Sequence, residues 1–154
     1  MVALATSEVE KLLGDLLGVA VTVRAGGAPK GAQGLAGHFL DPEGRPAAAV
    51  WLDRSLAACA GASLAMIPKG SAQEAIAAET LPDNLVENAG EVLNVLGTLL
   101  RADSGVKLGG VAQTPPGPTE LATLLTGPTD QSWFTIGVEG YGAGVALVVR
   151  PRGA

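Results

Sequence analysis

The sequence predicts an α+β fold in which long helices pack on a mostly antiparallel sheet of about six strands. Apolar residues make up 47% of the 154 residues, which is enough to build a sizeable core. Segments with helical and with alternating periodicity follow one another as a helix, three strands, two or three helices and three strands. Short connections between neighbouring strands favour antiparallel pairing. This order is compatible with a helix–three-strand unit used twice, and no linker divides residues 1–154 into more than one domain.

The first block begins with a helix and continues into three strands. Ser7 and Glu10 have the spacing of a capping box, and leucines supply the apolar stripe of the helix that follows. Asp41–Gly44 has the chemistry of a type I turn. Alternating apolar residues predict one short strand and then a hairpin around this turn, at Val19–Arg24, Gly34–Leu40 and Ala47–Leu52.

The middle of the chain is predicted to be helical. Asp53 is placed to cap the first helix of this region. Thr80 and Asp83 have capping-box spacing at the start of the last and longest one. The predicted helices are Arg54–Met66, Ala72–Glu79 and Pro82–Arg101.

The last block returns to strands. The predicted elements are a strand at Val106–Gln113, a short helix at Glu120–Leu125, and a hairpin of Ser132–Glu139 with Gly144–Arg150. This final hairpin has few charged residues, which indicates an exposed edge strand through which two copies of the chain pair.

Charge and targeting signals exclude several classes of protein. The net charge is −5 and no basic cluster is present, so nucleic acid is not an expected partner. No apolar run reaches the about 18 residues of a membrane span, and the N-terminus lacks the pattern of a signal peptide. The single cysteine, Cys59, rules out an intramolecular disulfide and is typical of a reducing cytoplasm, which is the expected location.

Metal binding and nucleophilic catalysis are not indicated. His38 and Cys59 are the only histidine and cysteine, and neither has a partner at metal-ligand spacing. The glycine-rich segment Gly26–Gly34 contains a lysine but does not match a phosphate-binding loop. No metal site and no bound cofactor is therefore expected in this chain.

A polar stripe on the long helix is the strongest candidate for a functional surface. At about 100° per residue, the stripe contains Asn84, Glu87, Glu91, Asn94 and Thr98. Glu87 and Glu91 are four residues apart, a spacing at which like charges cost about 0.2–0.5 kcal/mol. Because this repulsion destabilises the helix, the stripe indicates a role outside the fold. An ordinary solvated face remains the alternative.

The residues around this stripe resemble the signature of the CheC/CheX family of chemotaxis phosphatases. That signature is an acidic residue or serine, three residues, Glu, two residues, Asn, and a proline about twenty-two residues later. Here Glu87, Glu91, Asn94 and Pro116 occupy these positions, and the neighbouring Pro115 is the alternative for the proline. The glycine-punctuated hairpin and the helix after it, Gly34–Ile67, are also similar to the family.

The resemblance implies a hydrolase that removes the phosphoryl group from the phospho-aspartate of a CheY-like receiver domain in two-component signalling. By this analogy Asn94 orients the attacking water and Glu91 pairs with the receiver's active-site lysine, while Glu87, Thr98 and Pro116 contact the receiver. Magnesium belongs to the receiver. The resemblance is to the single-site CheX branch, whose members dimerise.

Two alternatives remain open from the sequence. One is a noncatalytic module that binds a receiver or oligomerises, as related domains in flagellar switch proteins keep the fold without the motif. Glu87, in place of the family's usual aspartate or serine, and Thr98, close to where the family commonly has Gly–Asn, motivate this reading. The other is a structural homo-oligomer that has no receiver partner.

Overall fold

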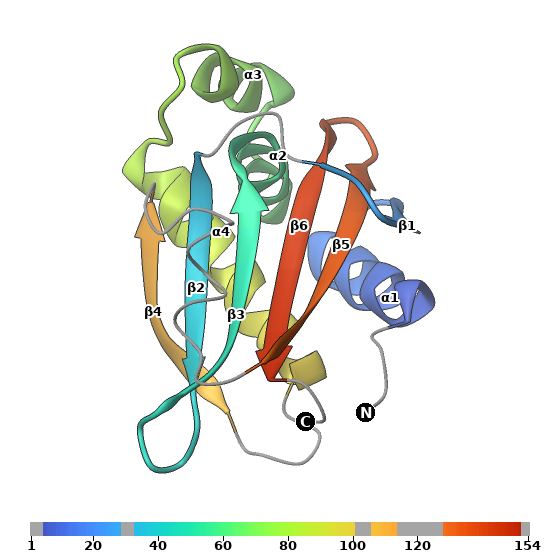
Figure 1. The fold of residues 1–154 in the computed structure, drawn as a ribbon. Coiled ribbons are helices and arrows are strands. Elements are labelled where there is room, and N and C mark those ends of the chain that lie inside the picture. The colour runs from blue at the N-terminus through green and yellow to red at the C-terminus, as the bar shows by residue number, and fades with distance from the viewer. Residues whose placement is uncertain (1–4, 29–32, 101–105, 114–127, 152–154) are drawn as a thin grey trace.

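The computed structural model describes residues 5–28, 33–100, 106–113 and 128–151. These residues form helices and one six-stranded antiparallel sheet, which confirms the α+β prediction (Figure 1). The strands are β1 (Val21–Ala25), β2 (Gly34–Leu40), β3 (Pro46–Asp53), β4 (Lys107–Gln113), β5 (Thr129–Val138) and β6 (Gly142–Pro151). The helices are α1 (Thr6–Leu17), α2 (Arg54–Leu64), α3 (Lys69–Ala77), α4 (Asp83–Leu96) and the 3-10 helix η1 (Gly97–Leu100).

The strands of the two halves of the chain are interleaved in the sheet. Their order, β1-β5-β6-β3-β2-β4, is symmetric. This order is unchanged when β1–β3 are exchanged with β4–β6 and the sheet is read from its other edge. A helix–three-strand unit used twice would produce this symmetry. The final hairpin lies inside the sheet, because β1 pairs with β5 and β3 pairs with β6. The expectation that it forms an exposed edge is therefore wrong, and the edge strands are β1 and β4.

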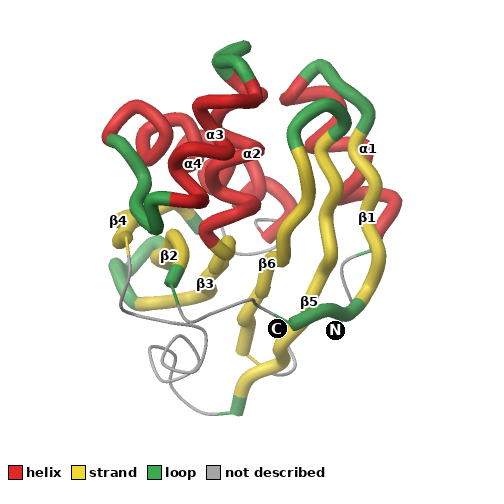
Figure 2. The backbone as a smooth tube through the Cα atoms, turned by 90° about the horizontal axis from the view of Figure 1, so that it is seen from above, coloured by secondary structure: helices red, strands yellow, loops and turns green. Residues whose placement is uncertain are grey.

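The helices cover one face of the sheet, as the view along the strands shows (Figure 2). The alternation of each strand divides its side chains between two faces. In β3, Val50 and Leu52 join the core cluster under the helices, whereas Trp51 belongs to a second buried cluster on the other face. There Trp51 meets Trp133 edge to face, with ring centroids 6.3 Å apart. The main core is mostly aliphatic, with Phe39 and Phe134 as its buried aromatic side chains.

The second helix, α2, is the most deeply buried helix of the described chain, and every residue from Leu56 to Ser63 is buried. Its small side chains let neighbouring elements approach closely. A Cβ on Gly61 would lie 2.9 Å from the carbonyl oxygen of Leu85 in α4. The predicted N-cap is confirmed, because Asp53 Oδ1 accepts a 2.9 Å hydrogen bond from the Leu56 N–H.

Replacing Ser63 by alanine is expected to raise the free energy of unfolding by about 1 kcal/mol. The Ser63 hydroxyl is buried in α2 and makes no hydrogen bond within the described residues, so removing it ends an uncompensated desolvation cost. Urea unfolding measures the change. Ser55→Ala in the same helix is the matched control, because the Ser55 hydroxyl donates a 2.6 Å hydrogen bond to the Ala143 carbonyl and its loss should destabilise. A loss of stability in Ser63→Ala would contradict this account.

The first helix begins without the predicted capping box. The helix starts at Thr6, its N-cap is Ala5, and no side chain caps it. The Glu10 carboxylate instead accepts a 3.0 Å hydrogen bond from the N–H of Val23 in β1. Glu10 therefore ties α1 to the edge strand, and this tertiary bond replaces the local one.

The turn between β2 and β3 is confirmed at Asp41–Gly44. The Gly44 N–H donates to the Asp41 carbonyl at 2.9 Å, and Gly44 has a positive φ of 82° that favours glycine. The hydrogen bond from the Arg45 N–H to the Asp41 carboxylate is the main reason why the pKa of Asp41 is lowered. Asp41 and Arg45 also form an exposed ion pair.

Met66, which follows the C-cap residue of α2, has a left-handed backbone conformation that glycine adopts more easily, with φ of 56°. The Ile67 N–H bonds the Ala62 carbonyl and the Met66 N–H bonds the Ser63 carbonyl, which is the pattern of a Schellman motif. Glu79 ends α3 in the same way, with φ of 58°.

Replacing Met66 by glycine is expected to stabilise the fold by about 0.5–1 kcal/mol, since the left-handed strain is removed and the lost side chain is 86% exposed. Thermal unfolding measures the gain. Met66→Ala is the control, because alanine keeps the left-handed strain. An equal gain for alanine and glycine would show that the strain is not the cause.

Candidate functional site

The helix α4 carries the predicted site residues, and close packing fixes its position. Its buried side consists of Leu85, Ala89, Val92, Leu93 and Leu96. These residues contact α2 on one flank and the sheet on the other. A Cβ on Gly37 of β2 would lie 3.2 Å from Leu93 Cδ1, so helix and strand are in close contact there. The helix can therefore present its opposite side rigidly.

The predicted polar stripe lies on this opposite side. Glu87 and Glu91 are exposed, Asn94 is half-buried, and the ends of the stripe, Asn84 and Thr98, are exposed. Among the described residues, neither glutamate has an ion pair and the Asn94 amide makes no hydrogen bond. Two unpaired carboxylates and one uncommitted amide thus share one helix face.

Asn94 lies on the flank of the stripe that adjoins the edge strand β4. It is about 40° around the helix from Gly90. A Cβ on Gly90 would lie 3.8 Å from Val111 Cγ2 of β4. This position explains why Asn94 is half-buried while Glu91 is exposed. Val111 itself is 37% exposed, so an accessible apolar side chain lies beside Gly90, one turn before Asn94.

The long helix ends earlier than predicted. The α-helix stops at Leu96 and continues as the 3-10 helix η1 over Gly97–Leu100, whereas the sequence predicted one helix to Arg101. The Thr98 hydroxyl donates a 2.7 Å hydrogen bond to the Val95 carbonyl, so it satisfies a group at the helix end. At the other end, Pro82 is the N-cap and no side chain caps the helix. The capping box predicted at Thr80 and Asp83 is therefore absent.

Pro116, the last predicted site residue, lies outside the described residues, as does the predicted helix at Glu120–Leu125. The strand that precedes Pro116, β4, is described up to Gln113. The contact of Pro116 with a receiver stays a prediction.

The other reactive residues do not form a site. Cys59 is buried in α2, and burial is the main reason why its pKa is raised, which keeps the thiol protonated. Within the described ranges, no three His, Cys, Asp or Glu side chains gather as a metal-binding group. Over the same ranges, no helix is long and apolar enough to cross a membrane.

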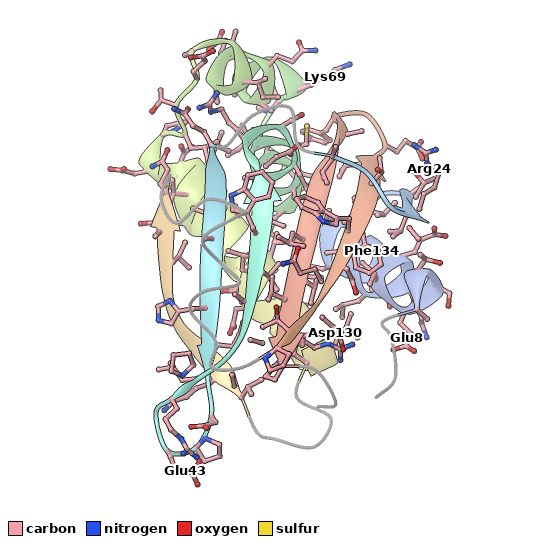
Figure 3. All side chains as sticks on the ribbon, viewed as in Figure 1. Glu8, Arg24, Glu43, Lys69, Asp130 and Phe134 are labelled. Carbon is pink, nitrogen blue, oxygen red and sulfur yellow. The ribbon has the colours of Figure 1, made fainter. Side chains whose placement is uncertain are left out.

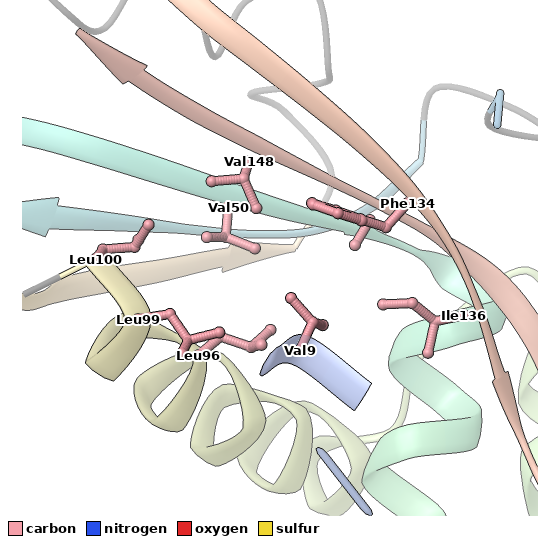
Figure 4. Close-up of a pocket in the computed structure, with 9 residues that line it drawn as sticks. Val9, Val50, Leu96, Leu99, Leu100, Phe134, Ile136 and Val148 are labelled. Atoms are coloured by element: carbon pink, nitrogen blue, oxygen red, sulfur yellow. The ribbon is translucent and has the colours of Figure 1, made fainter. Parts of the chain in front are cut away.

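A small cavity of about 10 Å³ lies between α1, η1 and the sheet (Figure 4). Figure 4 shows Val9 from α1, Leu96, Leu99 and Leu100 near the end of α4, and Phe134 from β5 pointing into it. Every side chain that lines it is apolar, so it offers no group for chemistry or for holding a water. It is a packing gap in the core and not an active site.

An open groove of about 380 Å³ lies between α3 and the first turn of α4. The sequence did not predict this groove, because the groove depends on how the helix predicted at Ala72–Glu79 packs against α4. Asn84 lines the groove and also begins the polar stripe, so the two surfaces are continuous. The groove is lined by Ser71, Glu74, Ala75, Ala78, Thr80, Pro82, Asn84 and Leu85.

Comparisons with known proteins agree on the fold. No protein-family model matches the chain, and no curated protein sequence matches it. A chain of the FliM–SpeE complex from H. pylori has a TM-score of 0.68 at 8% identity, covering 95% of this chain and 81% of that chain. A chain of the CheX–CheY–BeF3–Mg²⁺ complex from Borrelia burgdorferi has a TM-score of 0.50 at 11% identity, covering 96% and 98%. The chain has the fold of CheX and of the FliM middle domain.

A third structure of this CheX-like fold is the FliM middle domain from Vibrio alginolyticus. Its TM-score is 0.63 at 12% identity, and the match covers 95% of this chain and 88% of that chain. At such identities the likeness establishes the CheX-like fold alone. The CheC/CheX resemblance inferred from the Glu91–Asn94 motif is thus confirmed at the level of the fold.

Proposed function

We propose that this chain is a phosphatase that hydrolyses the phospho-aspartate of a CheY-like receiver domain. The observation that carries the proposal is the placement of Glu91 and Asn94 together on an unpaired, accessible face of α4. The CheX-like fold supports it, since one of the matching structures is a complex with CheY.

The reaction requires little of the chain beyond the positioning of the attacking water. Phosphoryl transfer depends on in-line alignment and on charge stabilisation more than on covalent help. The Asn94 carboxamide can both donate to and accept from one water, which a carboxylate cannot do. That water attacks phosphorus while the bond from phosphorus to the aspartate oxygen breaks, and inorganic phosphate and the free carboxylate result. Magnesium, which shields the phosphoryl charge, is expected in the receiver.

Docking is the role proposed for the carboxylates. Glu91 lies three residues before Asn94, so both side chains point from the same side of α4 toward one partner surface. An ion pair with the receiver's active-site lysine would orient the amide, and Glu87 extends the negative surface by one turn. Val111, which is exposed beside Gly90, offers an apolar contact at the edge of this surface.

A noncatalytic module is the second candidate. It is favoured by the FliM structures of the same fold, one in a complex with SpeE and one in a complex with FliG. It is also favoured by Thr98, whose hydroxyl is engaged with the Val95 carbonyl. On this alternative, the stripe binds a receiver domain and no hydrolysis follows.

The rate of phosphate release from phosphorylated receivers tests the proposal. Receivers of the source organism are loaded with a small-molecule phosphodonor and Mg²⁺, and decay is followed with and without the chain. Faster decay for at least one receiver is the expected result. Binding of a receiver without faster decay would favour the noncatalytic module, and the absence of both would overturn the two candidates together.

A further inference from the structure

The groove between α3 and α4 combines an apolar floor with a polar rim. Ala75 and Leu85, which line it, are 5% and 1% exposed, whereas Glu74 and Asn84 are exposed. Its volume of about 380 Å³ lies within the range of ligand pockets, about 300–1,000 Å³. A floor of this kind suits an aliphatic stem, and the rim supplies acceptors for a donor at the end of that stem.

Among the described residues, Glu74 is the one charged side chain that lines the groove, and the charges of α3 and α4 beyond Lys69 have one sign. Arg54 of α2 lines a neighbouring pocket with Glu79 and Thr80. Between Lys69 and Arg101 every charged residue is acidic: Glu74, Glu79, Asp83, Glu87 and Glu91. All five are exposed, and none forms an ion pair within the described chain. Lys69 is the first residue of α3 and does not line the groove. Figure 3 shows it at the right-hand end of that helix. The groove therefore favours a cationic occupant.

We propose that this groove binds a lysine or arginine side chain of the receiver, separate from the lysine that pairs with Glu91. The inference rests on the proposed function. The methylenes of the basic side chain lie on Ala75 and Leu85, and its charged end reaches Glu74, with Ser71, Thr80 and Asn84 as further acceptors. Because Asn84 joins the groove to the stripe, one receiver surface contacts both. The groove thus selects among receivers by a basic residue beside their active site.

Two variants test the groove by different means. Glu74→Lys reverses its charge, and Ala78→Trp fills it without changing charge. Each is expected to raise the KM for the phosphorylated receiver about tenfold, with a much smaller fall in kcat at saturating receiver. Glu8→Lys is the matched charge reversal, since Glu8 is exposed on α1, which packs near the C-terminal end of α4 and does not line the groove (Figure 3). Its KM should change little.

The outcomes separate this inference from the proposed function. If the chain accelerates decay but Glu74→Lys and Ala78→Trp have the KM of Glu8→Lys, the groove assignment is overturned and the phosphatase stands. If no receiver is bound or dephosphorylated, an NMR titration with a short dibasic peptide decides. Shifts of the Ser71, Ala75 and Asn84 amides, absent with an acidic peptide of equal length, support the groove. Unchanged amides overturn it.

Discussion

Replacing Asn94 by alanine is expected to lower the chain-accelerated dephosphorylation of the receiver at least about 100-fold. A methyl group cannot hold a water in line with the phosphorus–oxygen bond, so the positioning is lost. Binding should remain, because Glu87, Glu91 and Val111 are unchanged. Phosphate release at saturating receiver measures the chemical step, and a binding titration with a nonhydrolysable phosphoryl analogue measures affinity.

Asn88→Ala is the matched control for this variant. Asn88 has the same side chain, lies in the same helix and is also half-buried. It faces α2 instead, because a Cβ added to Gly61 would lie 3.5 Å from the Asn88 Cβ. Its removal should leave the rate of phosphate release almost unchanged. Full acceleration by Asn94→Ala, with a folded protein, would refute the assignment of Asn94 as the catalytic residue.

Replacing Gly97 by alanine is expected to destabilise the fold by about 3 kcal/mol. Gly97 has an ordinary helical φ of −58°, so the need for glycine is one of space. An added Cβ would lie 3.1 Å from two carbons of the Phe39 ring and closer still to a third. That ring is fully buried between β2 and the helices, so either the ring or α4 must move. Urea unfolding monitored by circular dichroism measures the loss.

Gly90→Ala provides the comparison inside α4, about one and a half helix turns before its end. A Cβ at Gly90 meets only Val111, at an ordinary contact distance of 3.8 Å. Alanine should therefore stabilise α4 by about 0.5–1 kcal/mol through its higher helix propensity. Equal effects of the two substitutions would show that contact with Phe39 does not explain the need for glycine at position 97.

The elements could be predicted from the sequence where local chemistry decided them. Asp53 caps α2 as expected, and Gly44 closes the predicted turn, because both depend on residues within a few positions. The capping box predicted at Ser7 and Glu10 does not form, because the Glu10 carboxylate accepts a hydrogen bond from β1, which is distant in the sequence. The edge position expected for the final hairpin failed because pairing of β1 with β5 is a long-range event that no local pattern records.

The candidate site divides in the same way. Helical periodicity was sufficient to place Glu87, Glu91 and Asn94 on one exposed face, since that depends on a single element. Periodicity could not show that Val111 of β4 lies beside Gly90 of α4, because the fold of the sheet brings this strand to the helix. The groove also needs two helices to meet. The absence of lysine and arginine between residues 70 and 100 was the one signal in the sequence that pointed toward it.

The interleaved strand order has a consequence for how the chain reaches its native state. Within the described sheet, β1 pairs with β5 alone, where Val21 is opposite Val138, and β4 pairs with β2 alone. The N-terminal half cannot complete its sheet during synthesis until β5 and β6 have left the ribosome. Such distant pairings predict slow folding and an early dependence on chaperones. Two fragments cut between α3 and α4 should stay unfolded apart and regain structure only when mixed.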